Sequence, residues 1–153
     1  MGGAAPPMRL FRLDIEGVFE ALRRYAEESL SKGAVAVVLI GSLARGDYTA
    51  FSDADVLIIV RDDGRRHIDR VIDFLDPRLP IDVEPRVYTV AELVKVASMC
   101  GRLIREVLLH GKLLAGDPSV IELLRGVHDR SCRDQPRYEE PLATVYVGER
   151  PGD

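Results

Sequence analysis

Asp53 and Asp55 stand two residues apart at the start of an apolar run, where their side chains could bind a metal ion. Residues two apart on a β-strand point to the same face, with Cα atoms roughly 6.6 Å apart. Two carboxylates placed in this way can converge on a hard cation such as Mg²⁺, which prefers oxygen ligands. Taken alone, an Asp-x-Asp pair favours the plainer alternative, two solvated acids at the entrance of a strand.

Gly41 and Ser42 directly follow another apolar run, residues 34–40, and could bind an anion. Glycine lets backbone N–H groups approach an anion closely, and a following helical turn offers further N–H donors. The Ser42 hydroxyl could then hold a phosphate oxygen, and Arg45 could add positive charge. The alternative is an ordinary turn in which Ser42 caps a helix. The anion site gains weight because its strand is expected beside the acids, so that phosphate and metal sites would face each other.

Phosphoryl transfer with two metal ions usually needs a third acid. Asp82 and Glu84 are the acids on a later strand, and both fall on its polar face. The plainer alternative is that both are exposed positions of an edge strand. Asp82 is the preferred candidate for the third acid, because the plainer alternative applies more strongly to Glu84. The sequence does not decide between the two.

The elements that would position these residues are predicted from apolar spacing. An apolar residue every three or four positions predicts helices over residues 15–30, 68–75, 90–109 and 119–128. Continuous or alternating apolar runs predict strands over residues 34–40, 56–60 and 81–87. Thr89 and Glu92 have the spacing of a capping box, and Pro85 indicates an edge strand. Leu113 and Leu114 fit either a strand or a packing loop.

The composition limits the classes of protein to be considered. The chain has 153 residues, which predicts one domain. The net charge of −4 is spread without blocks, which argues against a nucleic-acid partner. The longest apolar run is far shorter than the ~20 residues that span a bilayer, so no membrane partner is expected. Cys100 and Cys132 form no pair motif and predict reduced thiols in the cytoplasm.

The predicted organisation has three parts. Residues 1–14 are expected to be a flexible leader, and residues 15–128 are expected to form the domain. Residues 129–153 contain three prolines among mixed charges and predict a loose tail, apart from a possible strand over residues 143–147.

The stretch that contains the Gly-Ser and Asp-x-Asp pairs resembles the polymerase-β-like nucleotidyltransferase superfamily, and specifically its minimal nucleotidyltransferase branch. The shared pattern is Gly-Ser, then Arg-Gly, then Ser-Asp-x-Asp before an apolar strand. The residues that match this pattern are Gly41, Ser42, Arg45, Gly46, Ser52, Asp53 and Asp55. The resemblance covers about residues 15–117 and does not include the tail.

The resemblance implies an α+β fold, a small mixed β-sheet flanked by helices. It implies that a nucleoside monophosphate is moved from ATP or another nucleoside triphosphate to an acceptor hydroxyl, with two Mg²⁺ ions. The implied nucleotide-binding residues are Gly41, Ser42, Arg45 and Ser52. The implied catalytic and metal-binding residues are Asp53, Asp55 and Asp82.

The short chain resembles family members that work beside a helical partner of the HEPN type, as toxin–antitoxin pairs. In that branch the small protein adenylylates the toxin, which implies a tyrosine of the toxin as acceptor. One alternative is a non-catalytic nucleotide-binding antitoxin that acts by contact. Another is transfer to a small molecule, as in antibiotic-modifying relatives. The base preference, the acceptor and the oligomeric state are left open.

Overall fold

The computed structural model describes residues 15–49 and 52–133, and these contain a four-stranded mixed sheet. The strands are β1 (Ala34–Ile40), β2 (Ala54–Val60), β3 (Val83–Thr89) and β4 (Lys112–Gly116), in the order β3-β2-β1-β4. β1 pairs antiparallel with β2 and β4, whereas β2 and β3 run parallel. The predicted α+β class with a small mixed sheet is therefore confirmed, and 112–116 form a strand rather than a packing loop.

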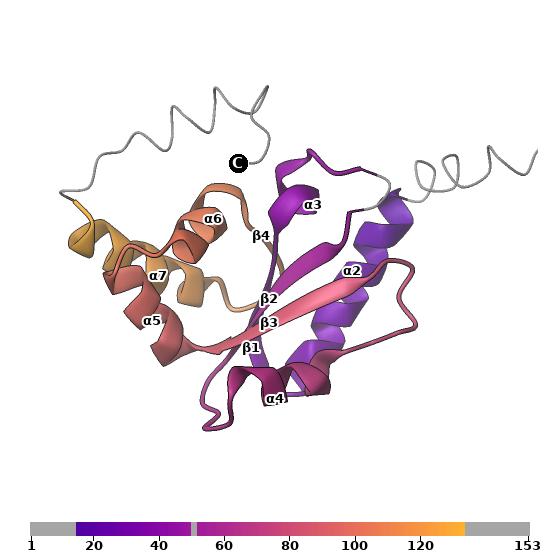
Figure 1. The fold of residues 1–153 in the computed structure, drawn as a ribbon, viewed down its shortest axis with the longest axis horizontal. Helices are drawn as coiled ribbons and strands as arrows, with labels where there is room; N and C mark the ends of the chain where they lie inside the picture. The colour runs from indigo at the N-terminus through magenta and orange to yellow at the C-terminus, as the bar shows by residue number, and fades with distance from the viewer. Residues whose placement is uncertain (1–14, 50–51, 134–153) are drawn as a thin grey trace, which may run out of the picture.

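The two central strands are buried on both faces, which explains why their sequences are apolar apart from Asp55 near the start of β2. Alternate side chains of β1 and β2 pack against different helices. One set faces α2 (Ile15–Ser31): Val37, Leu39, Val56, Ile58 and Val60. The other set faces α5 (Val90–Ser98), α6 (Arg102–His110) and α7 (Pro118–Ser131): Ala36, Val38, Ile40, Leu57 and Ile59. Figure 1 shows α2 on one side of the sheet and these three helices on the other.

The single helix predicted over residues 90–109 is wrong, because the structure divides it into α5 and α6. Cys100 between them adopts a positive φ of 58°, which no helix interior allows. Gly101 follows, and a Cβ on it would lie 2.5 Å from Cγ1 of Val96, so the turn needs a glycine there. The capping box at the start of α5 is confirmed: the Thr89 hydroxyl accepts from the Glu92 N–H at 3.0 Å, and the Glu92 carboxylate accepts from the Thr89 N–H at 2.9 Å.

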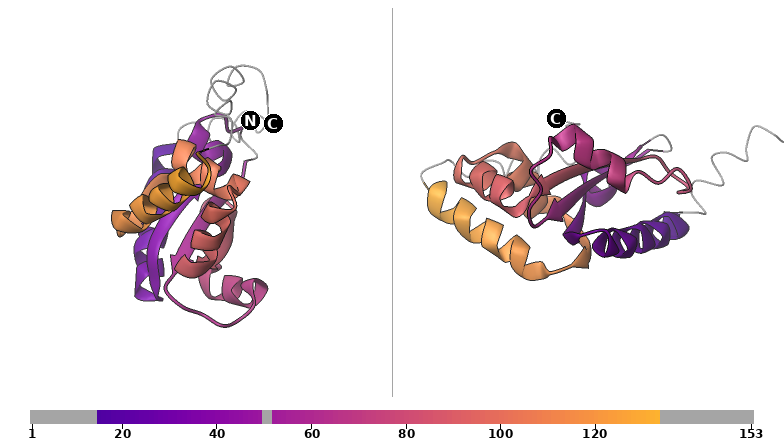
Figure 2. Two further views of the ribbon diagram at one scale, coloured as in Figure 1. Left: turned by 90° about the vertical axis from the view of Figure 1, so that its left-hand side faces the viewer. Right: turned by 90° about the horizontal axis from the view of Figure 1, so that it is seen from below.

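A disulfide joins Cys100 and Cys132, with Cα atoms 5.8 Å apart, so the prediction of reduced thiols is wrong. The residues are 32 positions apart in the sequence and meet because α5 packs against α7. The bond therefore fastens the turn between α5 and α6 to the end of α7. Figure 2 shows these helices together on their side of the sheet.

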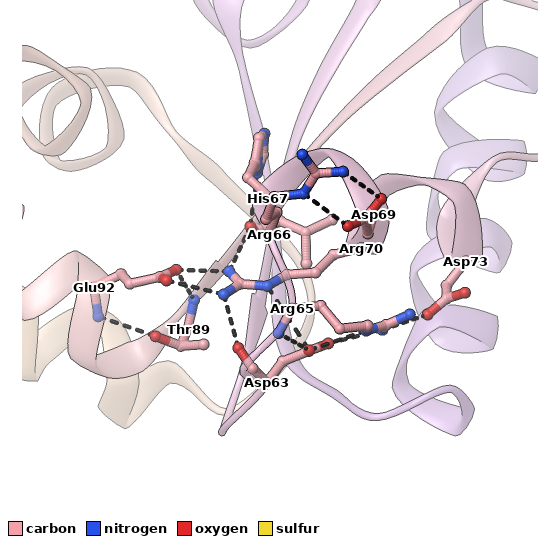
Figure 3. A network of polar contacts seen from close by, with 10 residues as sticks. Asp63, Arg65, Arg66, His67, Asp69, Arg70, Asp73, Thr89 and Glu92 are labelled. Atoms are coloured by element: carbon pink, nitrogen blue, oxygen red, sulfur yellow. Dashed lines mark hydrogen bonds and ion pairs between the residues drawn. The ribbon is translucent and has the colours of Figure 1, made fainter.

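A polar network at one end of the sheet fixes β3 to its neighbours (Figure 3). Arg70, from the short helix α4 (His67–Val71), has a side chain that is only 4% exposed. Its guanidinium donates to both carboxylate oxygens of Glu92, at 2.7 and 2.9 Å, and to the carbonyl oxygens of Asp63 and Val87, at 2.7 and 3.3 Å. The hydrogen bonds from Arg70 lower the pKa of Glu92 to about 2. The network ties the segment after β2 to the end of β3 and the start of α5.

Several smaller features complete the fold. β3 is an edge strand, as Pro85 predicts. A 3-10 turn, η1 (Ile72–Phe74), continues from α4 and places Phe74 in the core beneath α2. Within the described ranges, none of the helices combines the length and the apolar character needed to cross a membrane. The predicted leader, the possible strand over 143–147 and most of the predicted tail lie outside the described residues.

Candidate active site

Three strand ends meet at the edge of the sheet where the predicted site residues lie. Because β1 is antiparallel to β2 and β2 is parallel to β3, the end of β1 and the starts of β2 and β3 share one edge. The register places Asp55 directly between Ile40 and Glu84. Gly41–Ser42, which follow β1, are thereby brought beside Asp53 and Asp55, as the sequence predicts.

Gly41 makes room for Asp55. Its φ is +80°, which a side chain would strain, and a Cβ on it would lie 2.5 Å from Oδ2 of Asp55. The glycine that was expected to admit an anion thus also lets the carboxylate of Asp55 pack against the backbone. This second reason for glycine could not be read from the sequence.

The short helix α3 (Gly41–Arg45) links the Gly-Ser turn to the Ser-Asp-x-Asp segment. The Ser42 hydroxyl lies 3.2 Å from that of Ser52, which also accepts the backbone N–H of Thr49 at 2.8 Å. The position before the helix is Ile40, without a side-chain cap, so the alternative in which Ser42 caps a helix is wrong. Gly46 ends the helix in the left-handed conformation, at φ 90°.

Four acids gather on one face of the sheet at this edge. Asp55 is half-buried and Asp53 is exposed. Glu84 pairs with Asp55 across β2 and β3, and the Ala54 N–H donates to the Asp82 carbonyl at 2.8 Å, which continues this pairing so that Asp82 comes beside Asp53. Both candidates for the third acid therefore share the face of the Asp-x-Asp pair.

The electrostatics of Asp55 fit a cation site. Burial raises the pKa of its carboxyl, and the nearby charges of Glu84 and Asp53 raise it further, while Arg86 opposes them. A divalent cation would relieve this crowding of negative charge, and its preferred ligands are carboxylate oxygens. Among the described residues, no three acid, histidine or cysteine side chains already converge on one point. The donor set, with acids of adjacent strands on one face, fits Mg²⁺.

Glu106 on α6 is a site residue that the sequence reasoning missed. Its Oε2 accepts from the Gly41 N–H at 3.0 Å and from Nη1 of Arg45 at 2.9 Å. Arg45 also bonds to Asp47, with Nε 3.2 Å from Oδ2. A carboxylate of the chain thus accepts the backbone N–H that was expected to bind a phosphate oxygen. No local motif marks Glu106, since only the packing of α6 over the end of β1 brings it there.

A cleft of about 500 Å³ lies between the sheet edge and α6, and its lining includes some of the predicted site residues but not Ser52, Asp53 or Asp82. Gly41, Ser42, Arg45 and Asp55 contribute from the predicted motif. The rest of the lining comes from Ile40, Arg86, Arg102, Leu103 and Glu106. The sequence reasoning did not place Arg86 or Arg102 at the site, although Arg86 follows Glu84 by two residues and therefore lies on the same side of β3.

The chain matches a protein-family model and several solved structures. A protein-family model described as "Nucleotidyltransferase domain" matches residues 20–129. A solved toxin–antitoxin complex with AMP-PNP shares 18% identity at a TM-score of 0.50, and the match covers 82% of this chain and 92% of that one. At this identity the likeness shows a common fold.

Two further structures match at lower TM-scores. The toxin–antitoxin MntA–HepT matches with 17% identity and a TM-score of 0.41, over 89% of this chain and 92% of that one. A protein from Sulfolobus solfataricus, described as a candidate nucleotidyltransferase, matches with 21% identity and a TM-score of 0.48, over 67% of this chain and 84% of that one. No curated protein matches the sequence.

Proposed function

The chain belongs to the nucleotidyltransferase domain family, and from this membership we propose that it moves a nucleoside monophosphate from ATP to an acceptor hydroxyl with Mg²⁺. The observation that supports the proposal is that the end of β1 and the starts of β2 and β3 lie at one edge of the sheet. This arrangement places the Gly41–Ser42 turn and Asp55 around one cleft, with Asp53 two residues before Asp55. Groups that can bind phosphate and a carboxylate that can bind a metal ion thus face the same cleft, which suits a reaction at a phosphorus atom.

In this mechanism Asp53 and Asp55 would hold the metal ions, with Asp82 as the third carboxylate. The Gly41 N–H and the hydroxyls of Ser42 and Ser52 bind phosphate oxygens, assisted by the charge of Arg45. Mg²⁺ held by these acids would neutralise charge on the phosphates and lower the pKa of the acceptor hydroxyl. The acceptor oxygen forms a bond to the α-phosphorus while the bond to the bridging oxygen breaks. Pyrophosphate leaves, and the hydroxyl proton passes to water.

We propose a tyrosine of a helical HEPN-type toxin as the acceptor, which gives the chain an antitoxin role. The fold shared with a toxin–antitoxin complex that was solved with AMP-PNP supports this choice. Apolar side chains available for contact include Met99 and Leu109, which are 68% and 43% exposed around α6. α2 has no such exposed large apolar residue, so of these two surfaces the α5–α6 region is the one favoured for contact.

The Glu106 contact favours a second candidate, an antitoxin that retains the fold and acts by contact alone. If the carboxylate of Glu106 keeps the Gly41 N–H occupied, the nucleotide loses a donor that the reaction needs. In this candidate the acids of β2 have no chemical task. Transfer to a small molecule, such as an antibiotic, is the remaining alternative.

A cytoplasmic location belongs to the proposal, because ATP and the toxin are found there. The Cys100–Cys132 bond would be unusual in that compartment, except in proteins of hyperthermophiles, where intracellular disulfides are common.

The test is incubation with labelled ATP and Mg²⁺, with and without the product of the adjacent gene, followed by mass spectrometry of both proteins. AMP on a tyrosine of the partner, lost in Asp53→Asn, is the expected result. A stable complex without modification under any nucleotide would support action by contact. Labelling of a small alcohol or sugar, with the partner unmodified, would support the small-molecule alternative.

A further inference from the structure

Two arginines of the cleft make no direct salt bridge with any carboxylate among the residues that the structure describes. Arg86 reaches the cleft from β3 and Arg102 from the start of α6. Neither makes an ion pair within 4.0 Å, or a side-chain hydrogen bond, with any residue that the structure describes. Both side chains are exposed to the cleft, so their charge is available to a ligand.

The acids nearest to these arginines are engaged elsewhere. Glu106 stands one helical turn after Arg102, a spacing that permits an ion pair. Its carboxylate points instead to Gly41 and Arg45, which it contacts at 3.0 and 2.9 Å. Arg86 shares the face of Asp55 and favours its charged form, yet Asp55 packs against Gly41. The cleft therefore carries two guanidinium groups without direct partners.

We propose that Arg86 and Arg102 bind the phosphate groups of the nucleotide, an inference that rests on the proposed function. A guanidinium offers a planar fork of donors that matches two phosphate oxygens at once. Asp55 lines the same cleft as the two arginines, so β- and γ-phosphates that extend into the cleft from an α-phosphate at Asp53 and Asp55 would meet them. When pyrophosphate leaves, the negative charge that builds on it faces these cations.

The placement on two different elements predicts the selectivity of the cleft. Arg86 belongs to the sheet and Arg102 to α6, so a ligand must present phosphates to both walls at once. A triphosphate can do so, whereas a monophosphate held at the metal-binding acids cannot. Because these contacts go to phosphate oxygens, they distinguish nucleotides by phosphate number and not by base.

The experiment measures binding separately from transfer. Isothermal titration calorimetry with ATP and with inorganic tripolyphosphate, in EDTA and in Mg²⁺, is applied to Arg86→Gln, Arg102→Gln and the unchanged protein. Arg61→Gln serves as a matched control, because Arg61 is an exposed arginine directly after β2, at the end of the strand away from Asp55. Each cleft substitution should weaken both ligands roughly tenfold, the scale of one charge-assisted contact. AMP binding and the thermal midpoint should not change, and Lys at either position should restore part of the affinity.

The outcomes separate this inference from the proposed function. If tripolyphosphate binding depends on the arginines but no transfer is detected, the result would support phosphate binding by Arg86 and Arg102 and contradict the proposed transferase activity. Transfer that requires Asp53 but has the same KM for ATP in both arginine variants would overturn the inference alone. An effect at only one arginine would also overturn it, since the selectivity argument needs both walls.

Discussion

Replacement of Glu106 by Gln should strengthen ATP binding while it weakens the fold. The carboxylate is 26% exposed and accepts two hydrogen bonds, one of them from the guanidinium of Arg45. A phosphate oxygen that takes the Gly41 N–H must displace it, and a net charge-assisted hydrogen bond contributes about 1.5–3 kcal/mol when buried. Partial exposure reduces this contribution toward the ~1 kcal/mol of a surface pair. A displacement cost of about 1.4 kcal/mol corresponds to tenfold in affinity.

Gln keeps the size of Glu and an acceptor for the Gly41 N–H, but it has no charge to repel a phosphate. We therefore expect ATP to bind Glu106→Gln roughly tenfold more tightly in calorimetry. The free energy of unfolding should fall by about 1 kcal/mol, because the link between α3 and α6 is weakened.

Glu122→Gln is the control for this experiment. Glu122 also pairs with an arginine on a helix, Arg125, at 3.6 Å, but on α7, which does not line the cleft. The Glu122→Gln substitution should leave the affinity for ATP unchanged. Glu106→Gln is expected to raise the affinity for ATP and to lower the stability of the fold. If Glu106 had only a structural role, its replacement would lower both quantities together. That joint loss would refute the argument.

Three further predictions concern the acids. Asp53→Asn should abolish transfer and leave the thermal midpoint equal or higher, because it removes one like charge from a crowded face; transfer at the ordinary rate would contradict the metal assignment. Asp82→Ala should reduce kcat by orders of magnitude and Glu84→Ala should cost little, and the reverse ranking would shift the third carboxylate to Glu84. Arg70 lowers the pKa of Glu92 from 4.5 to about 2, so the ionised carboxylate stabilises the folded state fully at a pH above about 4.5. Urea unfolding should therefore show stability falling as the pH drops from about 4.5 toward 2, less steeply in Glu92→Gln.

The strands and the assembly of the site could be predicted because their causes are local. The continuous apolar runs over residues 34–40 and 56–60 predict strands buried on both faces, and the helices that cover both faces of β1 and β2 confirm it. The Gly-Ser and Asp-x-Asp pairs flank these strands, so an antiparallel pairing of β1 with β2 is enough to bring them together. That step needs only the order of the two strands and their antiparallel direction.

The features that the sequence did not predict depend on tertiary packing. The break between α5 and α6 follows from Gly101 approaching Val96 within a helical apolar pattern that otherwise continues. The bond between Cys100 and Cys132 requires α5 to lie on α7, which cysteine spacing does not encode. Glu106 belongs to the same class, because the packing of α6 over the end of β1 brings its carboxylate to Gly41.

The contacts of Gly41 show that the two halves of the site are not independent. Its Cα supports the carboxylate of Asp55, and its N–H donates to Glu106 at 3.0 Å. A movement of the Gly41 backbone that favours one partner must therefore change the other. If the proposed function is right, a phosphate that takes the N–H would release Glu106 and, through the same residue, would influence the position of Asp55 beside the proposed metal site. Phosphate binding and metal binding should consequently strengthen each other, which couples arrival of the nucleotide to formation of the catalytic geometry.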